Sequence, residues 1–245
     1  MAEEQLFSDK LLPKTLAEVI DHPQALERLN IIALRQSELD GACVVPLAQV
    51  GIEAPLPEPK RNIICIGLNY REHAVEFNAA MQLEENIPKT PIVFTKANTA
   101  VVGPESDIKP HSHLTVQLDY EAELAVIIGK EGTAIREEDA FDYIFGYTII
   151  NDVTARDLQK KHSQWFIGKS LNTFAPLGPY LVTKDEIEWP VQLDIQCRVN
   201  GELRGTTPPL RGTPPREGNH RPHSFLFPLF SFLFSLSSLV HRSCC

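Results

Sequence analysis

A long β-strand is indicated by residues 118–129, which read Leu118-Asp119-Tyr120-Glu121-Ala122-Glu123-Leu124-Ala125-Val126-Ile127-Ile128-Gly129. An aliphatic and β-branched run that ends at a glycine is typical of a strand. Because strand side chains alternate between two faces, Glu121 and Glu123 should point the same way. Two carboxylates on one face repel each other unless a cation lies between them. The pattern therefore indicates either a cation site or a solvated strand face with glutamates at alternate positions.

A third carboxylate ends the next strand-like run, which reads Tyr147-Thr148-Ile149-Ile150-Asn151-Asp152. If the two runs are neighbouring strands, Asp152 lies close to Glu121 and Glu123. Three oxygen ligands of this kind suit a hard divalent cation. We expect Mg²⁺ or Mn²⁺ at this cluster, with Ca²⁺ as an alternative.

A strand-to-helix turn follows Asp152 in the segment Val153-Thr154-Ala155-Arg156-Asp157-Leu158-Gln159. Thr154 is the expected N-cap of this helix. Arg156 and Gln159 are three residues apart, so they should share one face of the first helical turn. This face would lie beside Asp152, although an arginine here could equally form an ordinary surface ion pair.

Four motifs occur in order along the chain: Ile66-Gly67-Leu68-Asn69-Tyr70-Arg71-Glu72-His73, Asp119-Tyr120-Glu121-Ala122-Glu123-Leu124, Asn151-Asp152-Val153-Thr154-Ala155-Arg156-Asp157, and Gly168-Lys169-Ser170. Together they resemble the fumarylacetoacetate hydrolase superfamily, most closely its acylpyruvase-like branch. Several ordered motifs are more specific than any one of them. The resemblance runs from about Pro57 to about Leu203. It implies an α+β, strand-rich fold, the mixed β-roll of that family.

The resemblance also implies roles for eight residues. The metal ligands fall on Glu121, Glu123 and Asp152, the substrate-binding pair on Arg156 and Gln159, and the catalytic residues on His73, Glu76 and Lys169. The residue types fit these roles, because arginine pairs with carboxylates, a lysine charge can stabilise an enolate, and histidine exchanges protons near neutral pH. Outside these motifs, His73 would be an ordinary surface or core histidine and Lys169 an ordinary surface amine.

The implied reaction is metal-dependent hydrolysis of a C–C bond in a small 2-oxo or β-diketo acid, of the acylpyruvate or fumarylpyruvate type, through an enolate. His73 and Glu76 would activate the attacking water. Oxaloacetate decarboxylation or keto–enol tautomerisation at the same site is the first alternative, and an inactive, truncated family member is the second. The resemblance further implies a homodimer, provided that the fold is complete.

Composition divides the chain into three parts. Residues 1–56 form a helical N-terminal region and a proline-rich linker, with a helix break at Asp21-His22-Pro23. Residues 57–204 form a partial catalytic domain, in which Asn200-Gly201 indicates a β-hairpin. Strands are expected at Ile63–Gly67, Ile92–Thr95, Leu118–Ile128, Phe145–Asn151, Gly178–Thr183 and Leu193–Val199, and helices at Tyr70–Phe77, Glu137–Ala140 and Ala155–Lys161.

Residues 205–245 form a divergent tail rich in proline, phenylalanine and serine. We expect this tail to replace the family's C-terminal strands, so that the β-roll is incomplete and the activity of this chain is reduced. The apolar run from Phe225 to Val240 is short for a membrane span and is interrupted by Pro228. A C-terminal membrane anchor is the alternative, but we do not expect one.

Charge and cysteine content limit the partners and the compartment. The formal net charge is −9, which argues against nucleic acid as a partner, since backbone binding needs clustered Lys and Arg. None of the five cysteines has zinc-site spacing, and reduced thiols fit a cytosolic setting or an organelle matrix. The acidic N-terminus lacks the apolar run of a signal peptide. We therefore expect a cytoplasmic protein, or a mitochondrial-matrix protein if the source is eukaryotic, that acts on a small molecule.

Overall fold

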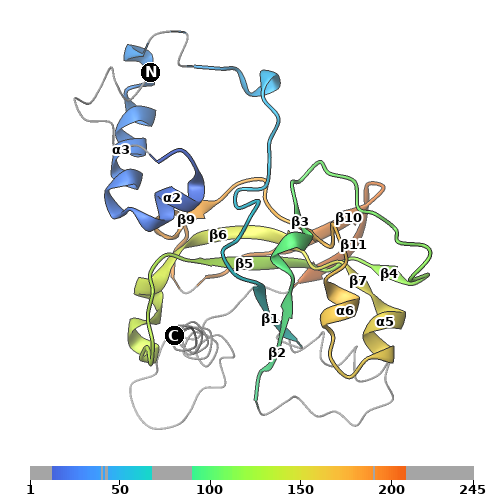
Figure 1. The fold of residues 1–245 in the computed structure, drawn as a ribbon. Helices are drawn as coiled ribbons and strands as arrows, with labels where there is room; N and C mark the ends of the chain where they lie inside the picture. Colours follow the sequence, from blue (N-terminus) through green and yellow to red (C-terminus); the bar gives the residue numbers. More distant parts are fainter. Residues whose placement is uncertain (1–12, 40, 42–43, 68–89, 190, 208–245) are drawn as a thin grey trace, which may run out of the picture.

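The computed structural model describes residues 13–39, 41, 44–67, 90–189 and 191–207. Two helices, α2 (Leu16–Asp21) and α3 (Pro23–Leu34), come first and lie apart from most of the strands (Figure 1). The break between them occurs at His22, as expected, because Pro23 can begin a helix but cannot continue one. The Thr15 side chain accepts a hydrogen bond from Glu18 N at 3.2 Å and caps α2.

The remaining described elements are mostly strands and short helices, as the α+β prediction requires. In chain order they are 3₁₀ turns at Gln36–Glu38 and Leu47–Gln49, β1 (Ile63–Gly67), β2 (Ile92–Lys96), a 3₁₀ turn at Asn98–Ala100, β3 (Val101–Val102), β4 (Leu118–Asp119), β5 (Ala122–Ile128), a 3₁₀ helix at Glu137–Tyr143, β6 (Ile144–Asn151), β7 (Thr154–Ala155), α5 (Arg156–Lys161), α6 (Phe166–Lys169), β8 (Ala175–Pro176), β9 (Val182–Thr183), a 3₁₀ turn at Lys184–Glu186, β10 (Ile195–Val199) and β11 (Glu202–Thr207).

The central sheet of the described residues has the order β5-β6-β9, and all its pairs are antiparallel. Two-stranded sheets β1-β2, β4-β7 and β10-β11 are antiparallel, whereas β3-β8 is parallel. The predicted hairpin lies between β10 and β11, where Asn200 and Gly201 both have positive φ, 53° and 83°. Positive φ at both central residues is what a tight type I′ hairpin turn requires.

Strand β6 is buried on both faces. Tyr147 packs in a cluster with Ile144, Ala140 and Val191. Ile150, on the other face, packs in a second cluster with Ala100 and Leu177. Because β6 is covered on both sides, its position is fixed by the core rather than by the loops around it.

The long strand expected at Leu118–Ile128 is interrupted at Tyr120 and Glu121. Its two halves, β4 and β5, nevertheless pair in one register with the continuous segment that contains β6 and β7. Asp119 lies opposite Thr154, and Ala122 lies opposite Asn151. Carried across the interruption, this register places Glu121 opposite Asp152. The Asp152 N–H donates to the Glu121 carbonyl at 2.8 Å, which supports that pairing.

Two other expected strands are shorter in the structure. The strand expected at Gly178–Thr183 contains only Val182–Thr183, and the one expected at Leu193–Val199 begins at Ile195. The expected helix at Tyr70–Phe77 and the tail beyond Thr207 lie outside the described residues. No helix in the described part of the chain has the length and apolar character needed to cross a membrane.

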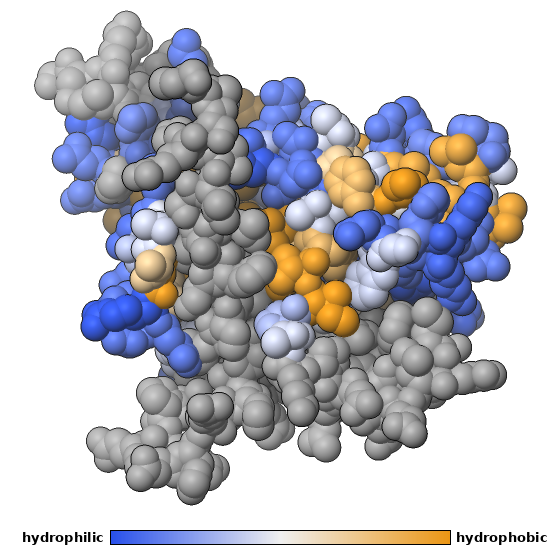
Figure 2. All heavy atoms as spheres, turned by 60° about the horizontal axis from the view of Figure 1, so that its bottom comes forward, coloured by the Kyte–Doolittle hydropathy of each residue, from blue (hydrophilic) through white to orange (hydrophobic). Residues whose placement is uncertain are grey.

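Large apolar side chains also reach the surface of the described part. Figure 2 shows hydrophobic side chains exposed between hydrophilic ones. Val116, just before β4, is 86% exposed, and Tyr180, just before β9, is 58% exposed. These residues belong to segments beside the sheets, so apolar surface remains available next to the strand pairs.

Candidate metal centre

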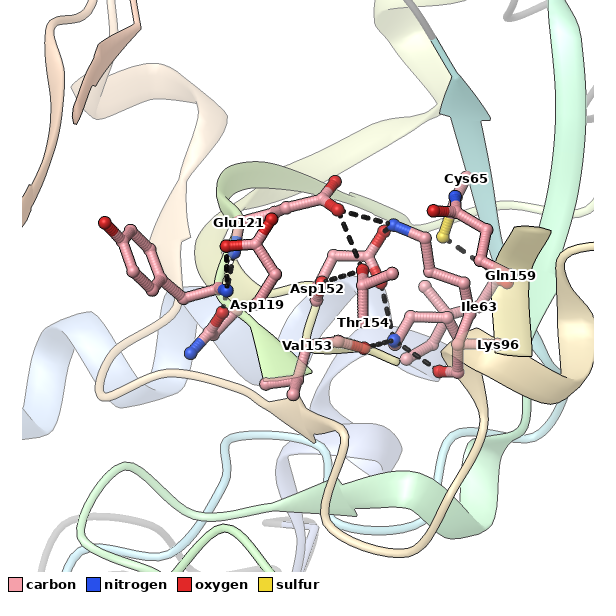
Figure 3. Close-up of polar contacts among 12 residues, drawn as sticks. Ile63, Cys65, Lys96, Asp119, Glu121, Asp152, Val153, Thr154 and Gln159 are labelled. Carbon is pink, nitrogen blue, oxygen red and sulfur yellow. Dashed lines mark hydrogen bonds and ion pairs between the residues drawn. The ribbon is translucent and has the colours of Figure 1, made fainter. Parts of the chain in front are cut away.

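Three carboxylates meet where β4-β7 joins β5-β6. Glu121 and Glu123 are two residues apart along one strand direction, and Asp152 lies opposite Glu121, so all three share a face. One oxygen from each of the three carboxylates can be chosen so that all lie within 4.8 Å of one another. Glu121 and Glu123 are partly buried and Asp152 is 1% exposed. The structure therefore brings together the three residues that the sequence singled out as metal ligands. Figure 3 shows two of them, Glu121 and Asp152, with the residues that contact them.

Two buried lysines hold the two oxygens of Asp152. Lys96, at the end of β2, donates from Nζ to Asp152 Oδ1 at 2.5 Å. Lys169, at the end of α6, donates from Nζ to Asp152 Oδ2 at 2.7 Å. Lys96 is fully buried and Lys169 is 2% exposed. With an ammonium donor on each oxygen, the Asp152 carboxylate is held in a fixed orientation.

Lys169 also bridges to Glu121, whose Oε1 lies 3.0 Å from Nζ. Burial disfavours the charge on Lys169, but Asp152 and Glu121 outweigh it and raise the pKa of this lysine. Lys169 is therefore a cation and a hydrogen-bond donor, not a base, at neutral pH. Burial lowers the pKa of Lys96, and its pairing with Asp152 offsets part of that effect.

Glu121 is the most heavily paired of the three carboxylates. Besides Lys169, its Oε1 accepts from the Thr154 hydroxyl at 2.8 Å and lies 2.8 Å from Arg156 Nη2. Burial works to raise the pKa of Glu121, but Lys169 and Arg156 outweigh it and hold the pKa below its usual range. Glu121 is thus ionised and ready to act as a ligand.

Glu123 has the opposite environment. Its carboxylate makes no hydrogen bond or ion pair with any residue that the structure describes. Burial, Asp152 and Glu121 together raise its pKa to about 8. A divalent cation in contact with this carboxylate would offset the cost of its burial and its repulsion by Asp152 and Glu121, because it supplies the missing opposite charge. The all-oxygen donor set and the unpaired Glu123 therefore fit a hard divalent cation.

Arg156 lies at the edge of the cluster, in the first turn of α5. Its Nε donates to Asp119 Oδ2 at 2.8 Å, and its Nη1 donates to Gln159 Oε1 at 3.1 Å. The predicted sharing of one helix face by Arg156 and Gln159 is confirmed by this contact. The Arg156 side chain remains 25% exposed, so it lies at the boundary between the carboxylate cluster and solvent.

Helix α6 reaches the site through a close approach to α5. A Cβ at Gly168 would lie 2.7 Å from Gln159 N and 2.9 Å from Ala155 O. Only glycine allows this distance, and the next residue is Lys169. The Lys169 ammonium also lies 5.1 Å from the centre of the Phe94 ring on β2, a favourable cation–π distance.

The sequence reading of Thr154 is wrong. Thr154 belongs to β7, and α5 begins one residue later, after Ala155, which has no side-chain cap. The Thr154 hydroxyl instead bonds to Glu121 and to the Asp152 carbonyl, the latter at 2.9 Å. In the sequence, a threonine before a helix resembles an N-cap. Only the strand register shows that its hydroxyl can instead bond to Glu121.

Lys96 and Asp119 are site residues that the sequence reasoning did not find. Lys96 continues the expected strand at Ile92–Thr95 by one residue, on the same face as Ile92 and Phe94. A lysine on that apolar face is the only local signal. Asp119 lies on the same strand face as Glu121 and Glu123, which is a detectable pattern. The expected catalytic residues His73 and Glu76 lie outside the described residues.

A family model described as the C-terminal part of fumarylacetoacetate (FAA) hydrolase matches residues 62–209, more than half of the chain. The chain belongs to the fumarylacetoacetate hydrolase family. The resemblance stated from the four motifs is thereby confirmed, and members of this family are enzymes.

Named relatives include two oxaloacetate tautomerases. The chain is 48% identical over 207 residues to oxaloacetate tautomerase YisK of Bacillus subtilis (strain 168), covering 83% of this chain and 67% of that protein. It is 46% identical over 162 residues to the mitochondrial oxaloacetate tautomerase fahd2 of Xenopus laevis, covering 65% of this chain and 48% of that protein. The chain thus spans about half to two thirds of the length of these relatives.

Solved structures of the family confirm the fold. A fumarylacetoacetate hydrolase from the psychrophile Exiguobacterium antarcticum aligns with a TM-score of 0.61 at 43% identity, covering 79% of this chain and 64% of that one. A 5-carboxymethyl-2-hydroxymuconate delta-isomerase from Mycobacterium smegmatis aligns with a TM-score of 0.55 at 35% identity, covering 66% of this chain and 58% of that one. Family members named for hydrolysis, isomerisation and tautomerisation therefore share this scaffold.

Proposed function

We propose that this protein is a divalent-metal-dependent tautomerase that interconverts the keto and enol forms of a small 2-oxo dicarboxylic acid of the oxaloacetate type. The observation that carries the proposal is the pairing of a three-carboxylate cluster with a protonated lysine, Lys169, 2.7 Å from Asp152 and 3.0 Å from Glu121. The names of the relatives in Bacillus and Xenopus support the same reaction.

The proposed ligands are Glu121, Glu123 and Asp152, with Mg²⁺ or Mn²⁺ as the cation. When bound, this cation would supply positive charge next to the substrate's carbonyl oxygen and so stabilise an enolate. Lys169 and Arg156 hold the pKa of Glu121 below its usual range, and Asp152 lies between Lys96 and Lys169. A cation held there would supply the opposite charge that Glu123 lacks among the described residues.

Lys169 is the proposed enolate-stabilising residue. Two of its three N–H donors meet Asp152 and Glu121, which leaves one for a substrate oxygen. In the keto-to-enol direction the carbon beside the carbonyl loses a proton to solvent, the electron pair of that C–H bond shifts onto the carbonyl oxygen, and a proton from solvent then adds to that oxygen. Negative charge therefore develops on that oxygen, where a fixed ammonium donor is most effective.

Arg156 and Gln159 are the proposed substrate-binding pair. The partly exposed Arg156 side chain lies beside the carboxylate cluster, and its guanidinium can donate hydrogen bonds to a substrate carboxylate. Asp119 and Gln159 hold this side chain from two directions, so its orientation is set before the substrate arrives.

The second candidate is C–C hydrolysis of an acylpyruvate or fumarylpyruvate, and the hydrolase-named relative from Exiguobacterium favours it. Hydrolysis needs an activated water in addition to the enolate-stabilising groups. His73 and Glu76 are the proposed activators. Replacing both with alanine should then reduce acylpyruvate cleavage more than oxaloacetate tautomerisation, whereas equal losses would argue against a water-activating pair.

Ultraviolet absorbance of the oxaloacetate enol tests the main proposal. With Mn²⁺ present, the full-length protein should accelerate the decay of enol absorbance, and a chelator should abolish the acceleration reversibly. Lys169→Met should lower the rate at least tenfold, and Lys184→Met, which removes a lysine that binds backbone carbonyls outside the cluster, should leave it unchanged. Metal-dependent release of pyruvate from an acylpyruvate without tautomerase activity would favour the hydrolase instead.

We further propose that residues 57–204 carry this activity, with residues 1–56 as a helical region and residues 205–245 as a divergent tail. The apolar surface beside the strands supports a homodimer, since a second copy could cover it. The relatives point to the cytoplasm in a bacterial source and to the mitochondrial matrix in a eukaryotic one.

A further inference from the structure

Lys96 has no assigned part in the proposed reaction, yet it is the most enclosed charged residue in the described chain. Its side chain is 0% exposed. A lysine is rarely enclosed to this degree unless its charge is paired. No substrate could reach its ammonium group, so any role in the reaction has to act through the groups that Lys96 contacts.

Those contacts are three, and they match the three donors of an ammonium group. Nζ donates to Asp152 Oδ1, to the Val153 carbonyl at 3.1 Å, and to the Lys169 carbonyl. Two of these acceptors belong to site residues from different elements, since Asp152 follows β6 and Lys169 ends α6. Lys96 therefore connects the strand that carries a candidate ligand with the helix that carries the candidate catalytic lysine.

The two lysines that hold Asp152 differ in what they can do. Lys169 contacts two candidate ligands, Glu121 and Asp152. Lys96 contacts Asp152 alone among the three carboxylates, from the side of β2. Removing Lys96 would leave the Asp152 carboxylate held by Lys169 alone, through Oδ2, with no donor on Oδ1, and would release the carbonyl end of α6.

We infer that Lys96 is a positioning residue of the metal centre: it sets the orientation of the Asp152 carboxylate toward the cation and fixes the end of α6 that presents Lys169. This inference rests on the proposed metal centre, and it adds a residue that acts on the cation only through Asp152. Groups that orient metal ligands in this way commonly change metal affinity about 10–100-fold when they are removed.

The sign of the effect separates positioning from simple charge. Lys96 carries a positive charge close to a proposed cation site, so by Coulomb's law alone its removal should strengthen Mn²⁺ binding. If Lys96 positions Asp152, its removal should weaken Mn²⁺ binding. A purely structural role would lower the thermal stability and leave the affinity of the folded molecules unchanged.

The test is Mn²⁺ calorimetry on the full-length chain, with thermal unfolding in the absence of metal as a parallel measurement. For Lys96→Met we expect a dissociation constant for Mn²⁺ at least tenfold higher than for the unchanged protein. Lys184→Met is the matched control, because Lys184 donates to the Phe141 and Asp142 carbonyls and contacts no carboxylate ligand; its Mn²⁺ affinity should be unchanged. Equal or tighter Mn²⁺ binding by Lys96→Met would overturn the inference.

Two further variants cover the remaining outcomes. If Lys96→Met does not fold, Lys96→Arg keeps the charge but presents a flat fork that cannot meet the same three acceptors, and the same tenfold loss is expected; unchanged affinity would overturn the inference. In an Asp152→Asn background, replacing Lys96 should cause no additional loss, because the effect runs through Asp152. If the unchanged protein binds no Mn²⁺, the proposed metal centre itself is wrong, and the inference fails with it.

Discussion

The two ends of the β5-β6 pair have opposite characters, although they are built from the same two strands. At one end, the face of the pair continues into Glu121, Glu123 and Asp152, enclosed with two lysines. At the other end, Ile144 and Tyr147 pack with Val191 in an apolar cluster. Apolar burial is favourable without partners, whereas buried charge is favourable only when it is paired. We therefore expect the apolar end to determine stability and the charged end to determine cation binding.

The largest effect is expected for Asp152→Ala, which leaves Lys96 and Lys169 without their shared partner. Breaking a buried ion pair from one side typically costs about 3–5 kcal/mol, so both the free energy of unfolding and Mn²⁺ affinity should fall. Urea denaturation and calorimetry measure the two. Asp157→Ala is the control, because Asp157 bonds to Thr115 and to backbone N–H groups rather than to either lysine. Retained stability in Asp152→Ala would mean that the lysines are not charged in the folded protein.

Ile144→Ala tests the apolar end alone. Ile144 is 2% exposed, and truncating such a side chain costs about 2–5 kcal/mol through lost burial and the cavity left behind. Mn²⁺ affinity of the folded variant should stay the same. Ile149→Ala, on the same strand but 42% exposed, should lose much less stability. A large drop in Mn²⁺ affinity for Ile144→Ala would show that the two ends are not independent.

Gly168→Ala tests the connection between α5 and α6. The added methyl group would lie 2.9 Å from Ala155 O and closer still to Gln159 N, so α6 must shift and carry Lys169 with it. Overpacking of this kind costs about 1–3 kcal/mol, and tautomerase turnover should fall with it. Gly51→Ala is the matched control, since nothing lies within 4 Å of a Cβ there. Full turnover in Gly168→Ala would show that α6 tolerates the displacement.

Glu123→Gln should have the smallest effect on stability, and of the opposite sign. It removes a carboxylate that no described residue pairs with, so the metal-free protein should unfold at an equal or slightly higher temperature. Mn²⁺ affinity should nevertheless fall, because a charged ligand is lost at nearly constant shape. Undiminished Mn²⁺ affinity would exclude Glu123 as a ligand.

Local pattern was enough to predict the carboxylate cluster but not the buried Lys96 beside it. The alternation of Glu121 and Glu123 and the strand-end position of Asp152 are visible in the sequence, and the structure brings all three together. Lys96 meets its partner 56 residues along the chain, and no local pattern specifies that contact. Thr154 shows the converse error, because its local pattern matched a helix cap, whereas its hydroxyl bonds to Glu121, 33 residues earlier in the chain.

The features of the fold also divide into those that neighbouring residues specify and those that depend on distant partners. The β10-β11 hairpin and the α2-α3 break were predicted from a few neighbouring residues, Asn200-Gly201 and His22-Pro23, whose backbone preferences are local. The interruption between β4 and β5 could not be predicted, because Tyr120 and Glu121 are unremarkable strand residues. It arises only from the pairing partner, where the chain turns from β6 through Asp152 into β7.

The shared register of β4-β7 and β5-β6 limits how chains of this kind can vary in length. Residues 129–143 connect β5 to β6 outside the paired region, so insertions or deletions there leave every facing pair intact. A single residue inserted between Asp119 and Ala122 would instead turn β4 to its opposite face relative to β5. Asp119 would then lose Arg156, although both residues would still be present in the sequence. A change in length between β5 and β6 thus leaves this register unaltered, while the two residues between β4 and β5 have to keep their number.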